Sequence, residues 1–146
     1  MTKASSEVSI ATLGSSPTRL YMNGRHRGQS PHRVAYFSED EGSSWSDPVV
    51  STLLDDAGAP GCERAVVQAN GTLFTSEPQG EGRTAMVLNC STDDGASWSY
   101  GRHLNNDKHG GYSDIVVLGH GKLLVVWEDN ESHNMWSHQV GTEWCG

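Results

Sequence analysis

Short apolar segments alternate with turn-forming residues along the chain, and no segment has the 3.6-residue period of an amphipathic helix. The apolar segments are only a few residues long and are bounded by Gly, Asn, Asp and Ser, which is typical of strands joined by tight turns. The segments that this pattern predicts to be strands are 20–22, 33–38, 73–75, 84–89, 114–118 and 122–128. The chain is therefore predicted to be all-β.

Two eight-residue segments share the motif S-x-D-x-G-x-x-W. Residues 38–45 read SEDEGSSW and residues 91–98 read STDDGASW, so the two copies begin 53 residues apart. In such a motif the Asp accepts hydrogen bonds from the turn backbone, the Gly takes a positive φ, and the Trp buries its ring just past the turn. We interpret both copies as structural turns and expect no catalytic role for Asp40 or Asp93.

The repeat extends beyond the motif, because Leu20-Tyr21-Met22 and Leu73-Phe74-Thr75 are also 53 residues apart. A unit of about 50 residues with four strands is typical of one blade of a β-propeller. The 146 residues provide fewer than three complete units, whereas propellers close with about four to eight blades. Because an open arc leaves sheet edges bare, we expect the chain to be part of a longer protein or to assemble with copies of itself.

Composition narrows the possible functions. With 10 Lys+Arg against 18 Asp+Glu the net charge is −8, which disfavours nucleic-acid binding. Only 35% of the residues are hydrophobic, and neither a membrane span nor an apolar signal-peptide core is expected. Cys62, Cys90 and Cys145 match neither a disulfide framework nor a zinc site. We expect no metal and no cofactor.

Three triplets fit the acceptor pattern for N-glycosylation, and they begin at Asn70, Asn89 and Asn130. A Ser/Thr-rich chain produces such triplets by chance, and Asn70 is also explained as part of an Asn-Gly hairpin turn. The triplets favour a secreted or lysosomal location only slightly, and the compartment stays open.

The two motifs resemble the Asp boxes of the sialidase superfamily, and nearly all of the chain resembles the last three blades of an exo-α-sialidase (neuraminidase). Asp boxes also occur in propellers that are not enzymes, so four further stretches in the family's order sharpen the resemblance. These stretches are Glu7 followed by LYMNGR at 20–25, LFTSEP at 73–78 followed by Arg83, GYSD at 111–114, and Trp127-Glu128. The resemblance implies a six-bladed β-propeller of the sialidase type, of which residues 1–146 form about three blades.

The resemblance also implies a set of site residues. Tyr112 would be the nucleophile and Glu7 its base, Arg25 and Arg83 would bind the substrate carboxylate, and Glu128 would orient an arginine. These residue types suit a sialic acid, because a guanidinium group forms bidentate hydrogen bonds with a carboxylate. A tyrosine avoids the repulsion that this carboxylate would exert on an anionic nucleophile, and a phenol needs a neighbouring base.

The chain departs from the family pattern in two important places. The family's first arginine and its acid/base Asp have no counterpart in the 146 residues, so the chain alone is expected to be inactive. Trp127 also stands where Tyr is usual.

Each candidate residue also has a plain structural alternative. Tyr112 could be an ordinary turn residue, Arg25 and Arg83 could be solvated charges, and Glu7 lies close to the chain start, where strands fray. Glu128 could belong to an acidic run.

Three functions follow as hypotheses from this pattern. The first is the C-terminal part of a retaining exo-α-sialidase that acts on sialylated glycoproteins, glycolipids or oligosaccharides. The second is a non-catalytic propeller module that binds sialylated or other acidic glycans, and the third is a purely structural propeller segment.

Overall fold

A computed structural model describes residues 5–14, 16–26, 32–55, 62–80, 82–104, 110–129 and 131–145. These residues form strands and connecting turns and no helix, which confirms the all-β prediction. The strands are β1 (Ser5–Leu13), β2 (Ser16–His26), β3 (His32–Ser38), β4 (Val49–Asp55), β5 (Ala65–Ala69), β6 (Thr72–Gln79), β7 (Ala85–Ser91), β8 (Ser99–His103), β9 (Ser113–Leu118), β10 (Lys122–Glu128) and β11 (Met135–Gly141).

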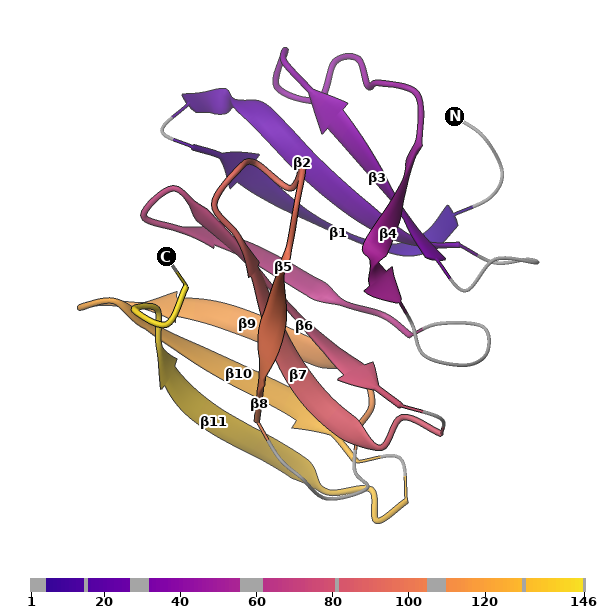
Figure 1. Ribbon diagram of the computed structural model, residues 1–146, viewed down its shortest axis with the longest axis vertical. Helices are drawn as coiled ribbons and strands as arrows, with labels where there is room; N and C mark the ends of the chain where they lie inside the picture. Colours follow the sequence, from indigo (N-terminus) through magenta and orange to yellow (C-terminus); the bar gives the residue numbers. More distant parts are fainter. Residues whose placement is uncertain are drawn as a thin grey trace.

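The strands build three antiparallel sheets, which follow one another in the chain (Figure 1). The first has the order β1-β2-β3-β4, the second β5-β6-β7-β8, and the third β9-β10-β11. The first strands of the three sheets lie next to one another, because β1 contacts β5 and β5 contacts β9. Up-and-down sheets whose inner strands gather at one axis are the blades of a propeller, so the predicted partial propeller is confirmed.

The Asp boxes, residues 38–45 and 91–98, form the same turn twice. In the first box, Ser38 Oγ accepts the amide of Gly42 at 2.9 Å and Asp40 Oδ1 accepts the amide of Ser44 at 2.8 Å. The second box repeats both bonds, each at 2.8 Å. Hydrogen bonds to the ionised Asp favour its charged form. The pKa of both box aspartates is lowered, mainly by the hydroxyl of Ser44 for Asp40 and by that of Ser97 for Asp93. The boxes are structural turns, as the motif predicts.

The second Asp box also contributes a buried side chain to the interface between the first and second sheets. Trp98 is buried there, with its ring centroid 5.9 Å from that of Tyr21. Gly95 has a φ of +88°, and a Cβ at this position would lie 2.8 Å from the Tyr21 ring. Only glycine therefore fits, because both the backbone conformation and the close approach exclude a side chain.

A disulfide links the second sheet to the end of the chain. Cys90 on β7 bonds to Cys145, which follows β11, 55 residues later. The spacing of the three cysteines matches no disulfide framework, yet Cys90 and Cys145 are paired, while Cys62 is buried and not disulfide-bonded. Spacing along the chain could not reveal the pair, because the two residues meet only when the sheets stack.

The three glycosylation triplets differ in their accessibility. Asn70 lies exposed in the β5–β6 turn with a φ of 51°. Asn89 is buried and donates to Glu77, so its amide is not accessible in the folded chain. Asn130 lies outside the described residues.

Candidate functional site

A β-bulge at the start of the first sheet sets the position of Glu7. Ser6 pairs with Arg25 and Val8 pairs with Gly24, so Glu7 is the extra residue on β1. Its φ is 51°, a conformation that few residues with a side chain adopt. Bulges interrupt the ladder and redirect a side chain, and they are frequent beside active sites.

The carboxylate of Glu7 joins two other predicted site residues. Its Oε2 accepts a hydrogen bond from Arg25 Nη1 at 2.6 Å, and its Oε1 accepts one from the Tyr112 hydroxyl at 3.0 Å. Arg25 on β2 and Tyr112 just before β9 are therefore brought together from the first and third sheets. The contact with Tyr112 could not be derived from sequence spacing, because Glu7 and Tyr112 are 105 positions apart.

Arg25 is held as a cation by this arrangement. Only 8% of the residue is exposed. Burial on its own lowers the pKa of Arg25, but the hydrogen bond and charge of Glu7 outweigh it, with a further contribution from Tyr112, so the pKa is raised. A permanent positive charge therefore lies beside the carboxylate and the phenol.

Arg83 approaches Tyr112 from the turn between β6 and β7. Its amide donates to Gly80 O at 3.0 Å, and its φ is 62°. Its guanidinium carbon lies 5.8 Å from the centroid of the Tyr112 ring, within the range of a cation–π contact. Because 43% of Tyr112 remains exposed, its ring is accessible to solvent as well as to both arginines.

Glu128 is tied to the site through its backbone. Its amide donates to Tyr112 O at 3.0 Å, which holds the end of β10 against the residue before β9. Its side chain borders a separate hollow with Asp129, His133 and Met135. Among the residues that the structure describes, its carboxylate is not paired with an arginine, so the orienting role implied by the resemblance stays a prediction.

Glu63 is a further acidic residue at this place, and sequence reasoning missed it. Its Oε2 accepts the amide of Ser113, the residue after Tyr112, at 3.2 Å. The only signal in the sequence is positional, because Glu63 lies just before β5 as Tyr112 lies just before β9. Since β1, β5 and β9 are neighbours, residues near the starts of these strands converge.

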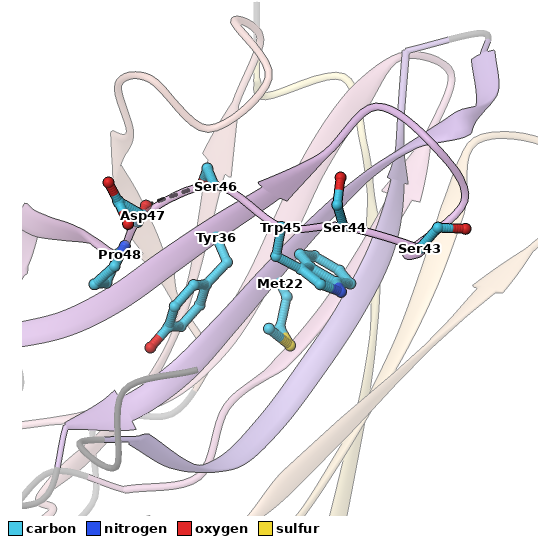
Figure 2. Close-up of a pocket in the computed structure, with 8 residues that line it drawn as sticks. All are labelled: Met22, Tyr36, Ser43, Ser44, Trp45, Ser46, Asp47 and Pro48. Carbon is cyan, nitrogen blue, oxygen red and sulfur yellow. Dashed lines mark hydrogen bonds between the residues drawn. The ribbon is translucent and has the colours of Figure 1, made fainter.

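A hollow of ≈ 290 Å³ lies elsewhere, on the outer face of the first sheet. Figure 2 shows Trp45, Met22 and Tyr36 together in this hollow, beside the chain segment that continues to Pro48. Trp45 is the counterpart of Trp98 in the other Asp box, yet it is only partly buried, because no further sheet covers this face in the described structure. We therefore regard the hollow as an uncovered packing surface and not as part of the candidate site.

The described residues contain no group of three or more His, Cys, Asp or Glu side chains that could hold a metal ion. Nor do they include a helix of the length and apolarity that crossing a bilayer requires. The described side chains gathered around Tyr112 provide two carboxyl groups, from Glu7 and Glu63, and two guanidinium groups, from Arg25 and Arg83.

Comparisons with known proteins agree with this fold. The family model described as "BNR repeat-like domain" matches residues 1–125, whereas comparison with the curated proteins finds no match. The Hadza microbial sialidase Hz136 aligns with 97% of this chain at a TM-score of 0.78 and 21% identity. The NanB sialidase from Streptococcus pneumoniae aligns with 95% at 0.67 and 20% identity. The leech intramolecular trans-sialidase aligns with 92% at 0.68 and 17% identity.

The chain spans only 28%, 22% and 23% of the lengths of these three proteins. At such low identities the likeness establishes the fold and leaves the reaction open. Because the family model matches residues 1–125, which are most of the chain, the chain belongs to the BNR repeat-like domain family.

Proposed function

We propose that the chain is the C-terminal part of a retaining exo-α-sialidase, which releases terminal sialic acids from glycoproteins, glycolipids or oligosaccharides. The observation that carries this proposal is the Glu7 carboxylate, which accepts a hydrogen bond from Arg25 on one oxygen and from the Tyr112 hydroxyl on the other. A tyrosine with a carboxylate in hydrogen-bond reach has the parts of an activated nucleophile.

In the proposed reaction Tyr112 attacks the anomeric carbon of the bound sialic acid. Glu7 Oε1, 3.0 Å from the hydroxyl oxygen, takes the phenol proton as the new carbon–oxygen bond forms. The glycosidic bond breaks, and its oxygen leaves with a proton from a general acid. Water then attacks the same carbon and gives a proton to the conjugate base of that general acid, while the bond to Tyr112 breaks and the phenol takes its proton back from Glu7, so that two inversions retain the configuration.

Arg25 and Arg83 are proposed to bind the carboxylate of the substrate. Each charge-assisted contact is expected to contribute about 1.5–3 kcal/mol. One nitrogen of Arg25 donates to Glu7, and a guanidinium has five N–H donors, so Arg25 is able to contact several acceptors at once. Arg83 lies against the Tyr112 ring, which places positive charge where the phenolate forms.

Two parts of this reaction have no counterpart in the 146 residues, namely the general acid and the first of three arginines. We assign both to the remainder of a longer protein, since the structural relatives are several times longer than the chain. General acid–base catalysis contributes typically about 10²–10⁴-fold. The chain alone is therefore not expected to turn over substrate at a useful rate.

A non-catalytic module that binds sialylated or other acidic glycans is the second candidate. It is favoured by the same missing parts, because Arg25 and Arg83 can hold a carboxylate without any acid catalyst. The two functions differ in what they require of Tyr112, since binding needs its ring and catalysis needs its hydroxyl.

The decisive experiment traps the nucleophile in the complete propeller. A fluorinated sialosyl donor is expected to leave a covalent adduct on Tyr112, detected by peptide mass spectrometry. Tyr112→Phe keeps the ring beside Arg83 and removes only the hydroxyl, so folding and binding are expected to persist while kcat falls by a factor of 100 or more, the scale of losing a catalytic group. Tyr36→Phe, at a tyrosine of the outer hollow, is the matched control and is expected to leave kcat unchanged.

The outcomes separate the two candidates. An adduct on Tyr112 supports the enzyme. Binding of sialic acid that Arg83→Ala abolishes, together with no adduct and no turnover in the complete propeller, supports the binding module. An adduct on another residue, or a Tyr112→Phe variant of normal rate, removes Tyr112 from the nucleophilic role.

A further inference from the structure

The segment Cys62-Glu63-Arg64, just before β5, contacts all three sheets. The carbonyl oxygen of Cys62 accepts a hydrogen bond from the buried Arg33 on β3. Arg64 forms an ion pair with Glu77 on β6, and both side chains are completely buried. These two anchors hold the middle residue, Glu63, in a defined place.

From that place Glu63 reaches the third sheet. Its Oε2 accepts the amide of Ser113 at 3.2 Å, and Ser113 directly follows Tyr112 in the chain. Because a residue's amide lies on the peptide unit that it shares with the preceding residue, this bond constrains the backbone that carries the Tyr112 ring. The tyrosine is therefore held at its hydroxyl by Glu7 and at its backbone by Glu63.

The charges around Glu63 come from three different strands. Burial raises the pKa of the Glu63 carboxyl above its usual range, and the negative charges of Asp114 on β9 and Glu7 on β1 act in the same direction. The Ser113 amide and the positive charge of Arg33 on β3 oppose the rise. The two carboxyl groups also meet the same short segment, since Glu7 accepts the Tyr112 hydroxyl and Glu63 accepts the amide of the next residue, Ser113.

We propose that Glu63 is a positioning residue, which fixes the backbone of Tyr112 through Ser113 and makes the neighbouring Glu7 a stronger base. The physical reason is that two like charges disfavour each other, so that an ionised Glu63 increases the affinity of Glu7 for a proton. A carboxylate with a higher proton affinity is a better general base near neutral pH. The inference rests on the proposed function of Glu7 and Tyr112, but its test requires no substrate.

The test is an NMR titration of the 146-residue chain labelled with carbon-13 and nitrogen-15. Glu63→Gln keeps an oxygen that can accept the Ser113 amide and removes the charge. In this variant the titration midpoint of the Glu7 carboxyl is expected to move to lower pH. The Ser113 amide resonance is expected to follow the ionisation of Glu63 in the parent chain and to lose that pH dependence in the variant.

Two further variants make the result specific. Glu63→Asp keeps the charge and is expected to leave the Glu7 midpoint closer to that of the parent chain. Glu41→Gln removes an equivalent charge from the exposed turn of the first Asp box and is expected to change neither signal. Loss of dispersed amide resonances would show that Glu63→Gln does not fold. In that case Glu63→Asp is compared with the parent chain. A Ser113 amide that follows the ionisation of the carboxyl group at position 63 in both chains then supports the proposal.

An unchanged Glu7 midpoint in Glu63→Gln overturns the electrostatic part of the proposal. A Ser113 amide in the parent chain that does not follow the ionisation of Glu63 overturns the anchoring part. Neither result tests the sialidase proposal, because no substrate takes part in the titration. That proposal is tested by the covalent adduct on Tyr112.

Discussion

Tyr21 illustrates how one residue can pack well while its polar atom does not contribute. Tyr21 is 0% exposed, and its hydroxyl has no hydrogen-bond partner among the described residues. Burial raises the pKa of Tyr21 to about 12, although the charges of Arg64 and Arg33 act in the opposite direction. The equivalent residue in the next repeat, 53 positions later, is Phe74, so the repeat itself does not need the hydroxyl.

Tyr21→Phe is therefore expected to leave the free energy of unfolding unchanged or to raise it by about 1–3 kcal/mol, the cost of a buried polar group without a partner. The pH dependence provides a second check. In the parent chain stability falls between about pH 10, where an unfolded tyrosine ionises, and pH 12, because the native hydroxyl keeps its proton longer. Urea unfolding at pH 7 and above pH 10 measures both effects. A variant that is less stable by 1 kcal/mol or more at pH 7 would show that the hydroxyl has a partner.

At the scale of elements, two connections cross between sheets where the strand ladder cannot. One is the 62–64 segment before β5, where Cys62 O accepts a hydrogen bond from Arg33 of the first sheet and Glu63 accepts the amide of Ser113 in the third. The other is the disulfide from Cys90 on β7 to Cys145 behind β11. Hydrogen bonds between strands stabilise each sheet internally, so these connections and the apolar contacts between sheets hold the sheets to one another.

Reduction of the disulfide is expected to destabilise the chain by about 4 kcal/mol, the loop-closure value for two residues this far apart. Cys145→Ser is expected to unfold at lower guanidinium concentration than the parent chain and to show no further change with reductant. Cys62→Ala, at the buried cysteine outside the disulfide, is the control, since the unfolding midpoint of this variant must still fall when reductant is added. A parent chain whose midpoint does not respond to reductant would contradict the link between the second sheet and the chain end.

At the scale of the whole molecule, the arc of three sheets leaves an apolar face open at each end. Val8 and Ile10 are 54% and 51% exposed on the first sheet, and Val116 is 52% exposed on the last. The two interfaces inside the arc show what such faces pack against, because each joins one sheet face to the next. Exposed apolar patches of this kind mark association surfaces.

The isolated 146-residue chain is therefore expected to self-associate at micromolar concentration, which light scattering coupled to size-exclusion chromatography measures. Ile10→Lys and Val116→Lys are each expected to shift the population towards the monomer, because a charge on an open face opposes packing. Thr92→Lys adds the same charge in an exposed Asp-box turn and is expected to have no effect. A parent chain that stays monomeric at all concentrations would contradict this expectation.

The sequence by itself determined the repeating architecture. The motif at 38–45 and 91–98 specified two identical turns, because Ser, Asp and Gly satisfy the turn through contacts within a few residues. The apolar segments between the motifs specified the strands in the same local way. The site residues Glu7, Arg25, Arg83 and Tyr112 could be named in advance only through a family resemblance, which carries residue types and order but no distances.

Only the tertiary structure decided which of these residues meet. The contact of Glu7 with Tyr112 at a separation of 105 positions, the Cys90–Cys145 disulfide and the place of Glu63 all depend on stacking one sheet against the next. Local patterns determine a turn or a strand because the interacting groups are neighbours in the chain. Contacts between sheets depend on the packing of whole apolar faces against each other. That packing makes β1, β5 and β9 neighbours and so brings the residues near their starts together.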